Sequence, residues 1–510
     1  MCGIYGYLGP AGRAVPEALK LVDPGILGRG EVAGILEDDG AFLHVSRLPL
    51  VDRGRAAQPF VSNCGRYAIL FNGEIFNFRE LRAALAGRYE FRTESDTETA
   101  LAAFLERGEA CLPEFRGQFA FVVYDRRERS WFAARDRLGI CPLYYVEDGE
   151  GAAFSSTISG LLPRRGTIRR LEPGCLKNSG SEPRRWYAPA AAEKDWTEPG
   201  LFAALRKGLE DSVRLRVDTG LPVAVVYSGG LDSSIVLSLA AKLHPDVTAF
   251  TIGEEDSEDV RTARRFCLER GIRHVVVPFG AEDVSGAAIG EAISHCELDE
   301  YLDIINAVIT VRLFRAIRER GIRIALCGDG SDELFGGYDM YRRADGPALR
   351  ELFLHKLGTL GNTELQRVDR AAMSNGVEAR VPFLDDAVVE IALGLPPVMK
   401  NRDGIEKWCL RRAFADELPD YVIARRKNPL SHSSGLHERI RMRMITFARH
   451  YRRAGLNRFA PIREDFSHAL RRAHHDVRRA IALHARSSDY SLWHKLAEFG
   501  KAFLRRTILR

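Results

Sequence analysis

The chain has 510 residues, of which 45% are hydrophobic and 28% are charged, a balance typical of a globular protein with two or three domains. Its 74 basic and 69 acidic residues leave a formal net charge of +5, which is too small for this length to indicate nucleic-acid binding. No apolar run approaches the roughly 18 residues of a membrane span, and the start lacks the basic-then-apolar order of a signal peptide. We therefore expect neither a nucleic-acid partner nor a membrane partner.

Nine cysteines are scattered along the chain without a CxxC pair. An odd, unpaired set in a chain of this size indicates reduced thiols, and it argues against both a disulfide framework and a zinc site. A cytoplasmic location is therefore expected.

Short apolar runs separated by Gly, Asn and Asp fill the first part of the chain, up to about Tyr187. This patterning predicts a β-rich domain with helices at residues 78–85 and 96–107. Pro, Ala and Gly then dominate the stretch "WYAPAAAEKDWTEPG" (186–200), which predicts an irregular linker. We place the first domain at residues 1–187, the linker at 188–200 and the second domain at 201–510.

Apolar strands alternate with helices in the second domain, as in "VAVV", "DVTAFTIG" and "IRIALCGDG". Such alternation predicts a parallel sheet with helices on both faces. The last hundred residues, from about Arg411, are expected to be helical and are rich in Arg and His, which favours a solvated helix surface over an RNA-binding one.

A cysteine stands directly behind the initiator methionine in "MCGIYGY". Because Cys is small, a preceding Met is usually removed, and Cys2 would then carry a free α-amine able to act as general base for its own thiol. An inert thiol in a frayed terminus would give the same sequence. This stretch alone does not decide between the two.

A glycine-rich turn, "YSGGLDSS" (227–234), joins a buried strand to a helix. Glycines let the backbone approach an anion, and a helix N-terminus directs N–H groups at it. The side chains of Ser228, Ser233 and Ser234 add donors, and Asp232 can bind a Mg²⁺ carried by phosphates. No GK[ST] follows, so the turn is not a Walker A motif. It resembles the loop of enzymes that split ATP into AMP and pyrophosphate.

An acidic loop, "LCGDGSDELFGGY" (326–338), follows another buried strand. Ligands bind at the carboxyl ends of parallel strands, so this loop is expected to face the first one. Asp332 is predicted to be a second Mg²⁺ ligand and Asp329 to meet the reacting substrate. A loop that only caps a helix remains the alternative.

Nine motifs connect the two halves: "MCGIYGYLG", "QPF", "FNGEIFN", "SDTE", "GQFAFVVYD", "RDRLGICPLYY", "YSGGLDSS", "GDGSDELFGGY" and "VEARVPFLD". In this order, over most of residues 1–430, the chain resembles the glutamine-hydrolysing asparagine synthetases. The resemblance implies an α+β N-terminal-nucleophile sandwich of stacked antiparallel sheets that supplies ammonia to an α/β synthetase domain with a helical C-terminal region.

In the first domain the resemblance implies that the Cys2 thiolate attacks the side-chain amide of glutamine once Met1 is removed. The oxyanion would be stabilised by the Asn72 side chain and the Gly73 N–H. The charged ends of glutamine would be bound by Arg47, Glu74 and Asp96.

In the second domain the resemblance implies that a carboxylate attacks the α-phosphate of ATP and that ammonia converts the acyl-adenylate into an amide. Lys427 would neutralise the pyrophosphate, and Asp232 and Asp332 would hold Mg²⁺. Glu378 and Arg380 are expected to be structural or to support the site, since a buried salt bridge explains them as well as chemistry does. Ammonia is expected to cross an apolar tunnel. The expected ATP-binding residues are Val226, Ser228, Gly229, Gly230, Asp232, Ser233, Ser234, Ile252 and Gly328.

The chain departs from the family pattern in three places. "RGEV" (29–32) stands where "RGPD" is common, and Asp329 stands where the best-known branch has Glu. In "LDIINA" (302–307), Ile305 replaces an Arg that would suit the α-carboxylate of aspartate. The acceptor can therefore be aspartate or another acid, such as a peptide, a sugar acid or a natural-product intermediate.

We therefore expect a glutamine- and ATP-dependent amidotransferase. A β-lactam-synthetase-like or lasso-cyclase-like ligase, which forms an intramolecular amide, is the alternative within the superfamily, and a catalytically idle scaffold is the alternative outside it. The complete set of glutamine-site residues argues against the first and the complete nucleotide loop against the second. The resemblance is also compatible with a homodimer.

Overall fold

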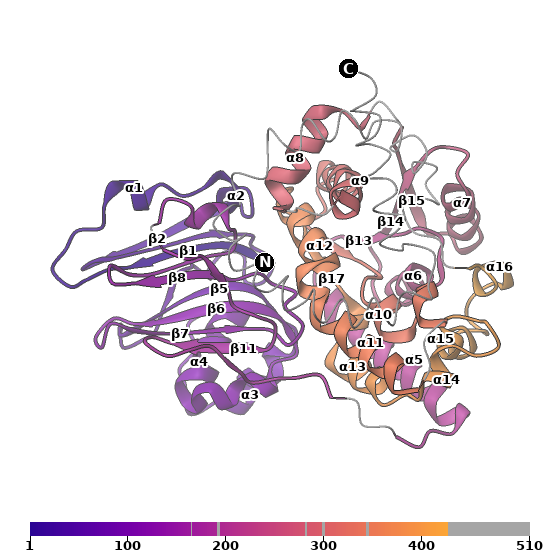
Figure 1. The fold of residues 1–510 in the computed structure, drawn as a ribbon, viewed down its shortest axis with the longest axis horizontal. Helices are drawn as coiled ribbons and strands as arrows, with labels where there is room; N and C mark the ends of the chain where they lie inside the picture. The colour runs from indigo at the N-terminus through magenta and orange to yellow at the C-terminus, as the bar shows by residue number, and fades with distance from the viewer. Residues whose placement is uncertain (165, 191–193, 281–282, 298–300, 343–345, 427–510) are drawn as a thin grey trace, which may run out of the picture.

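The computed structural model describes residues 1–164, 166–190, 194–280, 283–297, 301–342 and 346–426, except for the side chains of residues 301–305, 342, 346 and 347. Within this range the chain forms two lobes (Figure 1). The N-terminal lobe runs from strand β1 to strand β12, and the C-terminal lobe from helix α5 to helix α16. The predicted fold class, stacked antiparallel sheets followed by a parallel sheet, is confirmed. The domain bounds themselves stay a prediction.

Two six-stranded antiparallel sheets stack in the N-terminal lobe. Sheet A has the order β10-β8-β9-β1-β3-β2, and sheet B has the order β12-β11-β7-β6-β5-β4. The strands of sheet A are β1 (Cys2–Leu8), β2 (Val32–Asp38), β3 (Ala41–Arg47), β8 (Tyr144–Asp148), β9 (Gly151–Ser155) and β10 (Arg169–Arg170). Those of sheet B are β4 (Phe60–Val61), β5 (Tyr67–Ile75), β6 (Gly117–Asp125), β7 (Ser130–Arg135), β11 (Cys175–Asn178) and β12 (Arg184–Arg185).

Alternation along the strands explains why the sheets stack. In β1, Ile4 and Leu8 belong to the core between the sheets, whereas Tyr5 and Tyr7 belong to a smaller cluster on the outer face of sheet A. Successive side chains of a strand point to opposite faces, so a strand that is apolar at every position must be covered on both sides. Short helices α1 (Glu17–Lys20) and α2 (Pro24–Leu27) contribute to the outer cover.

Helices α3 (Phe78–Leu85) and α4 (Asp96–Arg107) lie on the outer face of sheet B (Figure 1). Both have the predicted bounds. The N-terminus of α4 is fixed by Ser95, whose hydroxyl accepts from the Glu98 N–H. Phenylalanines from β5 and β6 fill the space between sheet and helices.

A five-stranded parallel sheet, with the order β15-β14-β13-β16-β17, forms the centre of the C-terminal lobe, and helices lie on both sides of it (Figure 1). Its strands are β13 (Val223–Val226), β14 (Val247–Gly253), β15 (Arg273–Pro278), β16 (Ile324–Leu326) and β17 (Glu378–Arg380). The helices are α5 (Glu198–Val217), α6 (Leu231–Leu243), α7 (Glu258–Arg270), α8 (Gly286–Cys296), α9 (Tyr301–Glu319), α10 (Ser331–Phe335), α11 (Gly346–Thr359), α12 (Glu364–Met373), α13 (Asp386–Leu393), α14 (Pro397–Lys400), α15 (Trp408–Ala413) and α16 (Asp420–Ile423).

The stretch predicted to be irregular up to Gly200 ends earlier. Helix α5 begins at Glu198, because the Thr197 hydroxyl accepts from the Gly200 N–H and Pro199 occupies the first turn, where its missing N–H costs nothing. The end of the chain is predicted to be helical from about Arg411, and in the described part it contains the last residues of α15 and the short α16 with turns between them. The part beyond residue 426 lies outside the described residues.

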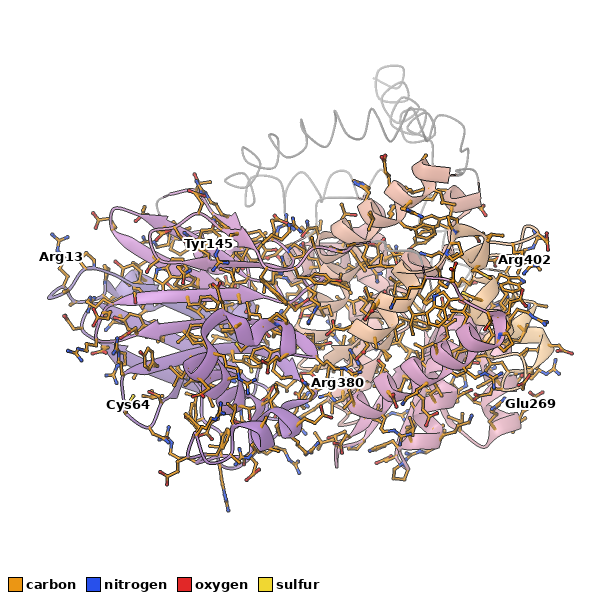
Figure 2. All side chains as sticks on the ribbon, turned by 90° about the horizontal axis from the view of Figure 1, so that it is seen from below. Arg13, Cys64, Tyr145, Glu269, Arg380 and Arg402 are labelled. Carbon is orange, nitrogen blue, oxygen red and sulfur yellow. The ribbon has the colours of Figure 1, made fainter. Side chains whose placement is uncertain are left out.

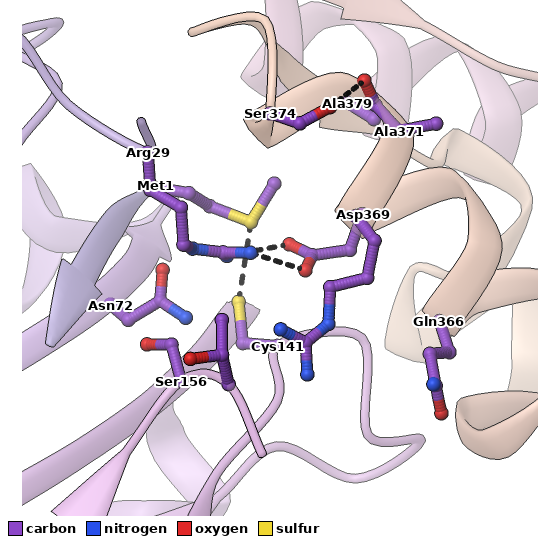
Figure 3. A network of polar contacts seen from close by, with 12 residues as sticks. Met1, Arg29, Asn72, Cys141, Ser156, Gln366, Asp369, Ala371, Ser374 and Ala379 are labelled. Atoms are coloured by element: carbon purple, nitrogen blue, oxygen red, sulfur yellow. Dashed lines mark hydrogen bonds and ion pairs between the residues drawn. The ribbon is translucent and has the colours of Figure 1, made fainter. Parts of the chain in front are cut away.

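Buried ion pairs join the two lobes. The guanidinium of Arg29, in the N-terminal lobe, donates to both carboxylate oxygens of Asp369 in α12, at 2.9 and 3.0 Å (Figure 3), and both side chains are 2% exposed. The Gln118 amide donates to the Ala379 carbonyl at 2.8 Å. These buried polar groups come from both lobes, so the lobes must dock in one relative position. A shift of one lobe against the other would leave buried charges unpaired.

Asp369→Asn should destabilise the protein by about 3–5 kcal/mol, because it leaves the buried Arg29 guanidinium without its counter-charge. Denaturant unfolding followed by fluorescence would measure the change. The matched control is Asp218→Asn, which removes the carboxylate from the exposed inter-lobe pair with Arg79 and should cost less than about 1 kcal/mol. Equal effects of the two substitutions would contradict a dominant role of the buried pair.

Candidate active site

Cys2 is the first residue of β1 and lies at the inner end of sheet A, where the two lobes meet. Its side chain is buried, its backbone N–H donates to Asn72 Oδ1 at 2.8 Å, and its Sγ accepts from Gln58 Nε2 at 3.7 Å. Burial raises the pKa of the Cys2 thiol, and the positive charges of the N-terminal ammonium and Arg47 oppose that rise. Ionisation of this thiol therefore depends on a base or cation held next to it.

The Asn72 side chain is held with one polar atom unused. Asn72 is fully buried on β5, and its Oδ1 accepts from the Cys2 N–H. Its Nδ2 has no hydrogen-bond partner. A buried amide donor without a partner costs free energy unless a ligand accepts from it. The donor is therefore available to a negatively charged oxygen close to the thiol.

The next residue, Gly73, has an extended backbone with a positive φ of +148°. A Cβ atom at this position would lie 2.1 Å from the Gln118 carbonyl oxygen of the neighbouring strand. The close pairing of β5 with β6 therefore requires glycine here.

Three charged residues surround the thiol. Arg47 lies directly opposite Cys2 in the β1–β3 pairing and donates to the carbonyls of Val51 and Asp52 at 2.7 and 2.9 Å. Glu74, on β5, and Asp96, the first residue of α4, are both 6% exposed. The structure thus brings all the predicted glutamine-site residues to one end of the sandwich.

The two carboxyls are tuned by burial. Burial and the charge of Asp96 raise the pKa of Glu74 well above its usual range. Burial also raises the pKa of Asp96 to about 6, although the N–H groups of Ile75 and Thr97 donate to it at 3.2 and 2.8 Å. Two buried carboxyls with raised pKa values fit a site that receives a cation.

Met1 occupies the boundary between the lobes in this structure (Figure 3). Its ammonium pairs with the buried Glu378 of β17, and its sulfur contacts Cys141 Sγ at 3.4 Å. Burial lowers the pKa of this ammonium, but Glu378, Cys2 and Glu74 together raise it, to about 10.

The departure "RGEV" is explained by contacts with the C-terminal lobe. Arg29 Nε donates to the Cys2 carbonyl at 3.1 Å, so the arginine of the motif still supports the nucleophile strand. Glu31 pairs with Arg318 and Arg323 at 2.8 and 2.6 Å. The acidic residue is therefore part of the inter-lobe contact.

The glycine-rich turn lies between β13 and α6, as predicted. Gly229 has a φ of +68°, and the hydroxyls of Ser228 and Ser233 lie 3.2 Å apart. No side chain caps the N-terminus of α6, so its first N–H groups remain for a ligand. Ser234 is buried, with its hydroxyl 3.2 Å from the Tyr227 hydroxyl.

The acidic loop packs on this turn. A Cβ atom at Gly328 would lie 3.2 Å from the Asp232 Cβ, and the Ser331 hydroxyl donates to Asp232 Oδ1 at 2.9 Å. Val226, Ile252 and Gly328 lie at or just after the carboxyl ends of β13, β14 and β16. This is the edge at which parallel sheets bind ligands.

A lysine that sequence reasoning missed connects the two loops. Lys407 is 2% exposed, and its Nζ lies 2.5 Å from Asp232 and 2.6 Å from Asp332. Both predicted Mg²⁺ ligands therefore converge on one cation. Asp329 lies 3.6 Å from Arg367 of α12.

Two sequence predictions fall outside what the structure describes. Lys427 is not among the described residues, and although the helix α9 includes position 305, the side chain of Ile305 is not described. Gln58 was also missed as a functional residue, although "QPF" was among the motifs. Its amide bridges Phe71 and Thr97 and reaches the thiol. No pattern in the sequence pointed to Lys407.

Comparisons with known proteins match the two parts of the chain to two different families of domain. A family model described as a glutamine amidotransferase domain matches residues 1–182, and one described as asparagine synthase matches residues 204–352 and 343–499. A glutamine-hydrolysing asparagine synthetase of Sandersonia aurantiaca is 34% identical over 85% of this chain and 87% of its own length. Asparagine synthetase B of Escherichia coli (strain K12), also glutamine-hydrolysing, is 32% identical over 85% and 83%.

Proposed function

The chain belongs to the glutamine-hydrolysing asparagine synthetase family, and on this premise we propose how its two sites divide the reaction. It is a glutamine- and ATP-dependent amidotransferase, a carbon–nitrogen ligase. Glutamine is hydrolysed to glutamate and ammonia, and a carboxylate is amidated through an acyl-adenylate with release of AMP and pyrophosphate. The alternative of an intramolecular ligase is not favoured.

The unused Asn72 donor is the observation that carries the assignment of the glutaminase site. We propose that Met1 is removed, that the Cys2 amine takes the thiol proton and that the thiolate attacks the side-chain carbonyl carbon of glutamine. The oxyanion accepts from Asn72 Nδ2 and the Gly73 N–H, while Asn72 Oδ1 holds the amine. Collapse breaks the C–N bond, the amine returns its proton to the leaving ammonia, and water hydrolyses the thioester.

The charged ends of glutamine are assigned to the residues around the thiol. Arg47 receives its carboxylate, and Glu74 and Asp96 receive its ammonium, since their buried carboxyls face the same end of the sandwich as Cys2. Gln58 would hold the thiol in place, because its amide is itself fixed by the Phe71 N–H and the Thr97 hydroxyl.

In the C-terminal lobe we assign ATP to the turn at residues 228–234. Its phosphates would lie on the uncapped N-terminus of α6, and the adenine near Val226, Ile252 and Gly328. Asp329 would meet the acceptor carboxylate as it attacks the α-phosphate. Lys427 keeps its predicted role at the pyrophosphate, and we assign a further positive charge near the phosphates to Lys407, which lies between Asp232 and Asp332.

The residues of this site fit a magnesium ion. Asp232 and Asp332 already hold one cation between them, the Lys407 ammonium, and Mg²⁺ commonly binds through one or two carboxylates together with substrate phosphates. When bound with ATP, Mg²⁺ would neutralise charge on the departing pyrophosphate. Lys407 would then be released toward the phosphate oxygens.

L-Aspartate is the proposed acceptor, on the strength of the relatives' names. Ile305 is the sequence feature that speaks for a different carboxylate, since it removes a cation from the pattern. The product assay below decides between them.

Among the described residues, no helix is long and apolar enough to cross a membrane. All nine cysteines are free thiols, eight of them buried. Free thiols favour a reducing compartment, and we propose a cytoplasmic location. Homodimerisation and the absence of a nucleic-acid partner stay predictions.

Protein given ATP, Mg²⁺, glutamine and L-aspartate should form asparagine, AMP and glutamate, which mass spectrometry would detect. Cys2→Ala should lower glutamate release by more than about 1,000-fold, because the nucleophile is lost, yet retain amidation from added ammonia. Glutamate without AMP or asparagine would contradict the aspartate proposal, and a panel of carboxylates would then identify the acceptor. Product formation from glutamine by Cys2→Ala would contradict the nucleophile.

The kcat/KM for glutamine hydrolysis should fall as the pH decreases through about 6. Below this pH Asp96, whose pKa is raised to about 6, gains a proton and no longer attracts the ammonium of glutamine. Initial rates of glutamate release across the pH range would measure the profile. Asp96→Asn should lose the decrease near pH 6, and retention of the same decrease in this variant would assign it to another group.

Lys407→Met should weaken ATP binding in the presence of Mg²⁺ by about 10- to 100-fold, because a charge-assisted phosphate contact is worth about 1.5–3 kcal/mol. Calorimetric titration with ATP measures this without turnover. The control is Lys242→Met, in the exposed Lys242–Glu417 pair, which should leave ATP affinity unchanged. Undiminished ATP affinity in Lys407→Met would restrict the lysine to a structural role.

A further inference from the structure

Strand β17 of the C-terminal lobe carries two charged residues into the glutaminase site. Glu378 is fully buried and Arg380 is 3% exposed. Arg380 Nε lies 2.7 Å from Glu378 Oε1, and its Nη2 lies 3.6 Å from Oε2 of Glu74. Figure 2 labels Arg380 where the two lobes meet. A residue of one lobe therefore faces the carboxylate that the other lobe offers to glutamine.

The guanidinium is fixed from several sides. Arg380 Nη1 donates to the Arg216 carbonyl at 2.6 Å, and the guanidinium lies 5.3 Å from the centre of the Phe76 ring. Its backbone carbonyl accepts from the Cys327 N–H at 2.9 Å. Because Cys327 belongs to the acidic loop, the backbone of Arg380 is hydrogen-bonded to a segment of the candidate ATP site.

Arg380 is one of the two positive groups that offset the negative charges next to Glu74. Glu74 on β5 faces the carboxyls of Asp96 at the start of α4 and Glu378 on β17, and each of these charges opposes its ionisation. The positive groups on the other side are Arg380 and the N-terminal ammonium, with Arg47 near the thiol. Arg380 is the largest of the influences that lower the pKa of Glu74.

We propose that Arg380 completes the glutamine site from the synthetase lobe, by pairing with the Glu74 carboxyl and holding it where it receives the ammonium of glutamine, so that glutamine is bound well only while the two lobes are docked. Arg380 does not touch the reacting amide and is therefore a positioning residue. The inference rests on the proposed role of Glu74 and adds a partner from the second lobe to it.

Arg380→Met and Arg380→Lys, in the full chain, test the proposal. Arg380→Met should raise the KM for glutamine by about tenfold or more and move the acid limb that belongs to Glu74 upward by about one pH unit, separately from the decrease near pH 6 that belongs to Asp96, because an opposite charge at this range lowers a carboxyl pKa by about 1–3 units. Arg380→Lys should restore the acid limb in large part. AMP formation with added ammonia should persist in both variants, which reports that the synthetase lobe is folded.

Arg216→Met is the matched control. Arg216 is equally buried at the same boundary, lies over the same Phe76 ring at 4.4 Å and pairs with Asp385 rather than Glu74. The Arg216→Met variant should have a lower melting temperature than the wild-type protein, but the same KM for glutamine and the same pH profile. A shift of KM and acid limb in Arg216→Met equal to that in Arg380→Met would overturn the proposal, since both would then reflect loosened packing.

An unchanged KM and acid limb in Arg380→Met would also overturn it. If instead the wild-type protein releases no glutamate, the proposed glutaminase function itself fails, and the two failures are thereby distinguished. Should Arg380→Met lose ammonia-dependent AMP formation, Arg380→Lys carries the test through its own KM and pH profile.

Discussion

The first strand of the chain is the constraint on which the candidate glutaminase site depends. Chain ends are ordinarily the least fixed part of a domain, yet β1 lies inside sheet A, paired with β3 on one side and β9 on the other. Cys2 itself pairs with Arg47 of β3, since the β9 pairing begins at Tyr5, and its side chain is buried at the start of this strand. The Asn72 contact on the Cys2 N–H then sets the direction of the backbone at its start.

The residues around the start of β1 also form part of the contact between the lobes. Arg29, which binds the Cys2 carbonyl, also pairs with Asp369 of the C-terminal lobe, and Gln118, which requires the glycine at position 73, also donates to Ala379. Residues that shape one site therefore hold the other lobe. In such an arrangement, docking energy and the geometry of the nucleophile cannot vary independently.

Much of this organisation could be predicted from local sequence signals. The bounds of α3 and α4 follow from amphipathic spacing and the Ser95 cap, and the turn at residues 227–234 follows from a glycine-rich junction of strand and helix. Helix α5 begins inside the stretch that its Pro and Gly content predicts to be a linker, because proline suits the first turn of a helix.

What the sequence could not provide were contacts between distant segments. Lys407 lies 175 residues from Asp232, and Arg380 lies far from Glu74, so no spacing rule connects either pair. A salt bridge between Glu378 and Arg380 was one of two interpretations of that motif, and the structure contains it, but its extension to the N-terminal ammonium and Glu74 depends on how the lobes dock.

The burial of Met1 has a consequence for the order of events during maturation. Its side chain is 2% exposed and its ammonium is enclosed with Glu378, so an aminopeptidase, which must take the chain end into its own cleft, has no access to it in the docked protein. If Met1 is removed as proposed above, its removal must therefore precede docking of the two lobes. Molecules that dock before Met1 is removed would then lack the free Cys2 amine that the proposed glutaminase step needs.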